Sequence, residues 1–194
     1  MRKFISIIFL IFYSFITNAQ NIPLEGDKVV YEIIVENSNL DKSTLYGECK
    51  KFVANNFKSA KNVIQTEDIA TGTIICNGYT KINTPHDRKW IRFYKNGISD
   101  DQFDFSVQFE NKNGKTKMRI YNLTLKSINH QFRNDQPYEN ILVNEIQQLK
   151  KMEGKKREKR LLRFNNSVDI VNSHFNNLLL AFEHQIKNYQ NNNW

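Results

Sequence analysis

Apolar residues recur at every second position in several stretches of the chain, and this period predicts β-strands. The stretches are Val29 to Glu36, about Asn62 to Asp68, Thr73 to about Ile82, and Thr116 to Lys126. In the clearest, Phe103, Phe105, Val107 and Phe109 alternate with Asp104, Ser106, Gln108 and Glu110. Gly72 and Asn113-Gly114 predict the turns of two hairpins. A phenylalanine-rich face opposite a polar face indicates an antiparallel sheet covered on one side only.

Apolar residues spaced three and four apart predict helices elsewhere. One begins after Asp41 as N-cap and ends between Asn55 and Lys58, with Leu45, Cys49, Phe52 and Val53 on its apolar stripe. A shorter helix carries Ile141, Leu142, Ile146 and Leu149, and a long one carries Val168, Val171, Phe175, Leu178, Phe182, Ile186 and Tyr189. We expect an α+β domain in the order strand, helix, hairpin, hairpin, helix, with two main helices on one sheet face. Residues 83–101, in which Trp90 to Tyr94 are either a short strand or part of the third, have no decisive pattern.

The first 19 residues are typical of a secretory signal peptide. Arg2 and Lys3 precede an apolar stretch from Phe4 to Ile16, and small residues allow cleavage between Ala19 and Gln20. An uncleaved anchor is the alternative, but a helix of this stretch rises about 20 Å, which is short of a hydrocarbon core of roughly 30 Å. The abundance of Asn and Lys over Ala indicates an AT-rich bacterial genome. We therefore expect residues 20–194 to be a single exported domain, periplasmic or secreted.

The positive charge is confined to one segment. Basic residues outnumber acidic ones by eight in the chain, and by six once Arg2 and Lys3 are removed. The segment 150–163, left open as helix or loop, has an excess of six by itself, with Lys155, Lys156, Arg157, Lys159, Arg160 and Arg163 as the residues that would contact an anionic surface. A solvated surface is the alternative and more common role of such a run.

Several short stretches resemble a family of secreted bacterial proteins known as a domain of unknown function with a TATA-binding-protein-like fold. They are Ile22 to Leu24 with Val29 to Glu32, Leu45-Tyr46, Asn56 to Gln65, Thr71 to Ile75, and the strands around Asn113-Gly114. The resemblance covers about residues 22–126, outside the helical part at about 139–190. This chain departs from the family pattern around Thr84 to Asp101 and at Thr116 and Lys117. The resemblance implies an α+β sheet packed by helices and an envelope location, with no established activity.

No motif for catalysis, a cofactor or a metal is present. The four histidines, His86, His130, His174 and His184, have no metal-binding spacing, and the two on the long helix are expected at its surface. We therefore expect a non-enzymatic binding or interaction module of the envelope, with Asp104, Ser106, Gln108 and Glu110 as its interaction face. A hydrolase of envelope polymers is the alternative, which a deep pocket containing two carboxylates, or His86 and an acid, would favour.

Two further expectations concern partners and cysteines. Nucleic acid is excluded as a partner because Asp104 and Glu110, on the polar face, would repel phosphate. Cys49 and Cys76 both face the interface of helix and sheet, where they form either a disulfide or two buried thiols.

Overall fold

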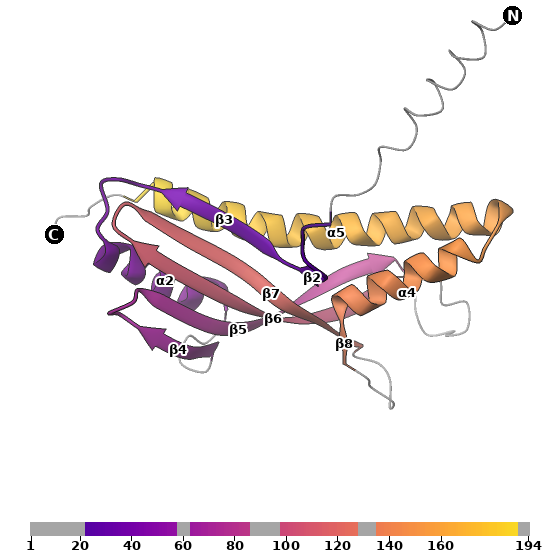
Figure 1. The fold of residues 1–194 in the computed structure, drawn as a ribbon, viewed down its shortest axis with the longest axis horizontal. Helices are drawn as coiled ribbons and strands as arrows, with labels where there is room; N and C mark the ends of the chain where they lie inside the picture. The colour runs from indigo at the N-terminus through magenta and orange to yellow at the C-terminus, as the bar shows by residue number, and fades with distance from the viewer. Residues whose placement is uncertain (1–21, 58–62, 86–97, 128–134, 190–194) are drawn as a thin grey trace, which may run out of the picture.

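A computed structural model describes residues 22–57, 63–85, 98–127 and 135–189 of the chain, and in this part the strands form one main antiparallel sheet (Figure 1). Its spatial order is β3 (Tyr31–Glu36), β7 (Lys115–Ser127), β6 (Ile98–Lys112), β5 (Thr73–Pro85) and β4 (Ile64–Asp68). The short β8 (Gln136–Pro137) pairs with the end of β7, and β1 (Leu24–Glu25) pairs with β2 (Lys28–Val29) in a separate hairpin. The α+β class and the antiparallel sheet are therefore confirmed.

The described helices are α2 (Lys42–Asn56), α4 (Tyr138–Lys150) and α5 (Gly154–Lys187). Figure 1 shows α5 running along the sheet, with α2 near its C-terminal half and α4 near its N-terminal half. Side-chain contacts agree with this view, because Gln185 of α5 donates to Glu48 of α2 over 3.0 Å, while Arg160 of α5 donates to Glu145 of α4. α2 and α5 are the two helices that were expected to cover the sheet, and α4 packs beside α5 as a third.

The buried layer lies between the helices and the predicted apolar strand face. Phe103, Phe105, Val107 and Phe109 are all less than 5% exposed. The ring of Phe175 packs against Tyr31 and Phe105 at centroid distances of 5.1 and 5.3 Å. Farther along α5, Phe182 packs against Phe52 of α2 at 5.2 Å and Phe109 of β6 at 5.3 Å. Aromatic rings thus connect both helices to the same sheet face.

The termini of α2 follow directly from its sequence. The Asp41 carboxylate accepts a hydrogen bond from the Thr44 backbone N–H over 2.7 Å, which confirms the predicted N-cap. This hydrogen bond lowers the pKa of Asp41. The predicted apolar stripe of α2 is buried, with Leu45 and Val53 fully inaccessible.

Both predicted hairpin turns contain a glycine with a positive φ, at +78° for Gly72 and +76° for Gly114. Residues with a Cβ are disfavoured in this region of φ, so these two positions favour glycine on conformational grounds.

The pairing of β6 with β7 contains a bulge. Asp104 pairs with Thr124 but Ser106 pairs with Tyr121, so Phe105 alone faces two residues of β7. This bulge at Asn122, with φ of 54°, changes which β7 residues point toward the helices.

The structure assigns residues in two stretches that the sequence left open. β5 continues to Pro85 instead of ending near Ile82, because β6 pairs with it up to Ile98. α5 begins at Gly154, well before the apolar stripe at Val168, so the basic segment consists of the last residue of α4, the turn that follows, and the first turns of α5. Lys, Arg and Leu are good helix formers and extend the helix without a buried stripe. The signal peptide with its Ala19–Gln20 cleavage site, and Trp90 to Tyr94, lie outside the described residues.

Candidate functional site

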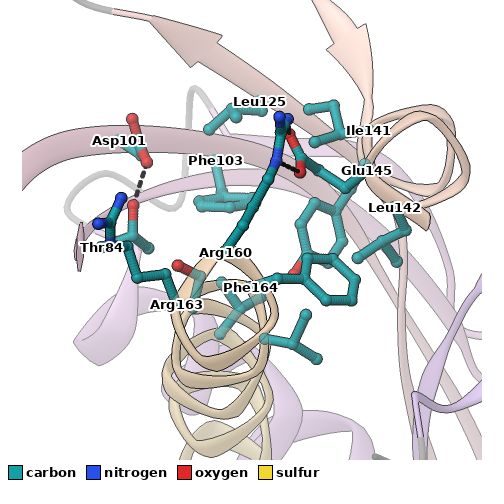
Figure 2. A pocket seen from close by; sticks show the side chains of 14 residues that line it. Thr84, Asp101, Phe103, Leu125, Ile141, Leu142, Glu145, Arg160, Arg163 and Phe164 are labelled. Atoms are coloured by element: carbon teal, nitrogen blue, oxygen red, sulfur yellow. Dashed lines mark hydrogen bonds and ion pairs between the residues drawn. The ribbon is translucent and has the colours of Figure 1, made fainter. Parts of the chain in front are cut away.

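A cavity of about 400 Å³ lies between the sheet, α4 and the N-terminal half of α5 (Figure 2). Most of its wall is apolar. The apolar residues that line it are Phe103, Leu125, Tyr138, Ile141, Leu142, Phe164, Val168 and Val171. Ligand pockets in proteins have volumes of roughly 300–1,000 Å³ and combine an apolar wall with a few polar groups, and this cavity fits that description.

Each wall of the cavity follows from a local feature of the sequence. On α5, Phe164, Val168 and Val171 are spaced four and three apart, so they lie on one helical stripe. On the sheet side, the bulge at Asn122 turns Leu125 toward the helices, whereas an uninterrupted alternation from Met118 and Ile120 would turn it away. The apolar wall therefore depends on an irregularity in β7.

Charged side chains hold α4 against α5 at one side of the cavity. Arg160 donates to both carboxylate oxygens of Glu145, from Nε over 2.9 Å and from Nη2 over 2.8 Å. The same guanidinium donates to the side-chain oxygen of Gln148. One turn earlier, Arg157 Nε donates to the backbone carbonyl of Leu149 over 3.3 Å. Two arginines predicted to contact an anionic surface are thus used to position the helices, and bidentate pairing of this kind fixes geometry.

The other side of the cavity contains a buried carboxylate. Asp101 is 5% exposed and accepts a hydrogen bond from the hydroxyl of Thr84, which is 4% exposed. Figure 2 shows Arg163 pointing toward this side, away from Arg160, so the two arginines diverge from α5. Tyr138 of α4 also lines the cavity, and burial together with the Asp101 charge raises the pKa of its phenol. The phenol is therefore neutral at physiological pH.

The predicted interaction face lies on the opposite, helix-free side of the sheet. We call this surface the open face; its β6 residues are Asp104, Ser106, Gln108 and Glu110, all half-buried. Lys126 of β7 lies 2.6 Å from Asp104, and Lys117 of β7 lies 3.0 Å from Glu110. Two acids of the open face are thus paired with lysines of β7: Lys117 lies directly across from Glu110, and Lys126 reaches Asp104 diagonally from the position across from Gln102. The absence of a nucleic-acid partner stays a prediction.

The lysines of the basic segment are exposed, as a solvated or surface-contacting role requires. The lysines Lys155, Lys156 and Lys159 lie at the start of α5, and within the described residues none of them forms an ion pair.

The cavity was not predicted, because its lining residues come from five separate elements. The nearest sequence signal was the helical spacing of the apolar residues in α4 and α5.

His174 is not a surface residue, in contrast to the exposed His184. It is half-buried in α5, and its Nε2 lies 3.0 Å from the hydroxyl of Thr80 in β5. The ring packs edge-on against Phe175 at 5.5 Å. Burial lowers the pKa of His174 below its ordinary value of 6.5, because the charged imidazolium loses hydration. The position next to a core phenylalanine explains why the surface expectation failed here.

This burial predicts a dependence of stability on pH. The folded-state pKa of His174 is below the unfolded-state value of 6.5. Burial of the neutral imidazole therefore stabilises the fold fully above pH 6.5, and this stabilisation is lost as the pH falls through the folded-state pKa. We expect the urea midpoint to be lower at about pH 5.5 than at about pH 7.5, and His174→Asn to reduce that difference. His184→Asn, at an exposed position of the same helix, should leave it unchanged. Equal pH dependence in wild type and His174→Asn would contradict the assignment.

Cys49 and Cys76 are both fully buried and are free thiols in the structure. Burial raises the pKa of each to about 12. The Cys49 thiol donates to Asn111 Oδ1 over 3.3 Å, and Asn111 in turn accepts from the Thr116 hydroxyl over 2.8 Å. The disulfide remains a prediction.

Within the described residues, no helix is long and apolar enough to span a membrane. No group of His, Cys, Asp and Glu side chains in those same ranges is arranged to hold a metal ion.

Comparison with other proteins places the fold. Residues 31–126 match the domain of unknown function DUF4468 with TBP-like fold. A crystal structure of a DUF4468 family protein from Bacteroides ovatus is similar over 91% of this chain and 95% of that one, with 15% identity and a TM-score of 0.57. A TBP-like protein from Parabacteroides distasonis is similar over 87% and 99%, with 11% identity and a TM-score of 0.60. None of the curated proteins matches the chain. Through its sheet and first helix, the chain belongs to the DUF4468 family with TBP-like fold.

Proposed function

We propose that this protein is an exported, non-enzymatic binding module of the bacterial envelope, and that the cavity between the sheet, α4 and α5 is its ligand site. Export is supported by the signal-peptide pattern of residues 1–19. Binding is supported by one observation above all: a cavity of about 400 Å³ with an apolar wall and charged groups at two sides. An apolar wall of this kind favours a ligand that is largely hydrocarbon.

The cavity is a better candidate than the open face for a ligand. On the open face, polar groups bond mainly to one another: the Ser106 hydroxyl donates to Asn77 Oδ1 over 3.0 Å, and Gln108 Nε2 donates to Glu110 over 3.1 Å. A partner would have to replace these bonds at little net gain. In the cavity, by contrast, apolar wall surface would be removed from contact with water. The open face remains the predicted surface for a protein partner.

A neutral fluorescent naphthalene, N-phenyl-1-naphthylamine, tests the site. We expect saturable binding of one molecule per chain, and Ser167→Trp, which adds bulk to the cavity wall, to raise the Kd at least about tenfold. Leu162→Trp is the matched control, because Leu162 is 62% exposed on the same helix and should leave binding unchanged. If Ser167→Trp does not fold, Leu125→Trp replaces it.

Two results would overturn the binding proposal. One is the absence of saturable binding by the wild type. The other is an unchanged Kd in a folded cavity variant.

One observation favours the alternative of a hydrolase: Asp101 and Glu145 both line the cavity. Both oxygens of Glu145 accept from Arg160, however, and this arrangement suits an ionised carboxylate and not an acid that donates a proton. If the protein is a hydrolase, it should cleave purified peptidoglycan, and Asp101→Asn should abolish that cleavage. Absence of cleavage by the wild type would exclude this activity on that polymer.

A further inference from the structure

The charged side chains of the cavity wall already have partners. Arg160 and Glu145 form the bidentate contact, so their two charges compensate each other (Figure 2). Asp101 accepts the Thr84 hydroxyl, and Arg163 also has an interaction partner. A charged ligand would have to break one of these contacts, and it would lose its own hydration on entering the cavity. The cavity is therefore better suited to an uncharged ligand.

One buried polar group of the wall is unbonded. Tyr138, the first residue of α4, is 5% exposed, and its hydroxyl forms no hydrogen bond with the described residues. Its ring is held edge-on against Phe103 at a centroid distance of 5.3 Å. In the described part of the chain, only Arg119 Nε is a side-chain polar atom that is both inaccessible and without a partner. The Tyr138 oxygen is therefore accessible, and it opens into the cavity that this residue lines.

The Tyr138 hydroxyl is a fixed hydrogen-bond donor. Burial and the Asp101 charge raise the pKa of the phenol, so it keeps its proton at physiological pH. A phenol donates better than it accepts, because the ring delocalises a lone pair of the oxygen. A buried hydroxyl that forms no hydrogen bond is costly, so a ligand oxygen that accepts from Tyr138 is favoured. A carbonyl oxygen provides such an acceptor without carrying a charge.

A second hydroxyl of the wall, that of Ser167 on α5, is a weaker candidate. It also forms no hydrogen bond with the described residues, but its side chain is only half-buried, so water reaches it more easily. A serine within a helix can also donate to the backbone carbonyl four residues earlier. The phenol oxygen of Tyr138 lies too far from its own backbone for such a bond. Tyr138 is therefore the residue that gains most from a ligand.

We infer that the ligand of the cavity is an uncharged, mainly hydrocarbon molecule whose ketone, aldehyde or ester carbonyl accepts a hydrogen bond from the Tyr138 hydroxyl. Its hydrocarbon part packs against Leu142, Phe164 and Val168. Because a cavity of about 150 Å³ holds benzene, one of about 400 Å³ has room for roughly fifteen non-hydrogen atoms. This inference rests on the proposed binding function and adds the chemical class of the ligand and the residue that recognises it.

Displacement of N-phenyl-1-naphthylamine at about pH 7.5 by three naphthalenes of similar size tests the inference. 2-Acetylnaphthalene carries a carbonyl group, 2-ethylnaphthalene carries no oxygen, and 2-naphthoate carries a negative charge. We expect the ketone to bind at least about tenfold more tightly than the naphthoate, because the charged groups of the wall already have partners. The ketone and the hydrocarbon also differ in hydrophobicity, so they are compared through a variant.

Tyr138→Phe removes the donor and keeps the ring that packs against Phe103. It should raise the Kd of 2-acetylnaphthalene about three- to tenfold, the range for one hydrogen bond, and leave the Kd of 2-ethylnaphthalene unchanged. Since the hydroxyl has no partner among the described residues, the variant should also keep the urea midpoint of the wild type.

Tyr31→Phe is the matched control. Tyr31 is also buried, but its hydroxyl donates to Asn172 Oδ1 over 2.6 Å, and the residue does not line the cavity. Loss of this hydrogen bond should lower the urea midpoint and leave the Kd of both naphthalenes unchanged. The two tyrosine variants should therefore give opposite results, one losing affinity and the other losing stability.

An infrared measurement replaces the variant if Tyr138→Phe does not fold. The carbonyl stretching band of 2-acetylnaphthalene bound to the wild type should lie below its frequency in hexane, because a hydrogen bond weakens the C=O bond. A band at the hexane frequency would overturn the inference.

The outcomes separate the two proposals. Equal losses of ketone and hydrocarbon affinity in Tyr138→Phe, or no loss of either, would overturn the inference and leave the binding function standing. Binding of 2-naphthoate as tight as that of the ketone would overturn the assignment of an uncharged ligand. Loss of ketone affinity in Ser167→Ala but not in Tyr138→Phe would overturn the role of Tyr138. Failure of the wild type to bind N-phenyl-1-naphthylamine would overturn both proposals.

Discussion

Replacing Phe182 by alanine is expected to lower the free energy of unfolding by about 3–5 kcal/mol, which is the range for removal of a buried aromatic ring. Phe182 is fully inaccessible and packs against both Phe52 of α2 and Phe109 of β6. Its removal would leave a cavity where three elements meet, and α5 would lose its aromatic contact with α2. Urea unfolding followed by circular dichroism measures the change.

A matched control lies two residues earlier on the same helix. Leu180 is 55% exposed, so Leu180→Ala should change the free energy of unfolding by no more than about 0.5 kcal/mol. A loss below about 1 kcal/mol for Phe182→Ala would mean that α5 is not part of the core, and the placement of the cavity would then have to be abandoned.

Gly72→Ala is expected to cost about 2–4 kcal/mol, more than the 1–2 kcal/mol of a positive φ alone. A Cβ on Gly72 would lie 2.5 Å from the backbone oxygen of Asn111, a contact that real Cβ atoms do not make. Asn111 is 1% exposed and donates to the Gly72 carbonyl from both its backbone N–H and its side chain, each over 2.9 Å. Relieving the clash would therefore disturb a buried polar group that also holds Cys49 and Thr116.

Gly114→Ala separates the clash from the backbone conformation. Gly114 has nearly the same φ, but a Cβ there would meet its nearest atom, Ser38 Cα, at an ordinary 3.5 Å. We expect Gly114→Ala to cost about 1–2 kcal/mol, which is the price of the positive φ alone. Equal losses in the two variants, measured by urea unfolding, would show that the clash between a Cβ at position 72 and Asn111 adds nothing to the loss of stability.

Local sequence determines much of this fold, and those parts were predictable. The alternation from Phe103 to Phe109 requires only that one strand face be buried, and Asp41 caps α2 through a bond to a residue three positions away. Gly72 and Gly114 mark turns because their φ values are intrinsically favourable for glycine. In each case the deciding interaction is short-range.

The remaining features depend on contacts between distant residues. The start of α5 at Gly154 is supported by Arg160 and its partners on α4, and no pattern within the basic segment indicates them. His174 is half-buried because Thr80 lies beside it, 94 positions away in sequence. Leu125 reaches the cavity only through the bulge at Asn122. The cavity was therefore beyond single-sequence reasoning, although most of its wall residues were correctly assigned to strands and helices.

The two walls of the cavity have different origins within the chain. Thr84, Asp101, Phe103 and Leu125 belong to residues 31–126, whereas Tyr138 to Val171 follow that family domain. Substitutions in α4 or α5 would consequently change the shape of the cavity while the sheet keeps its strand register. The two walls can therefore vary independently, because separate stretches of the chain encode them.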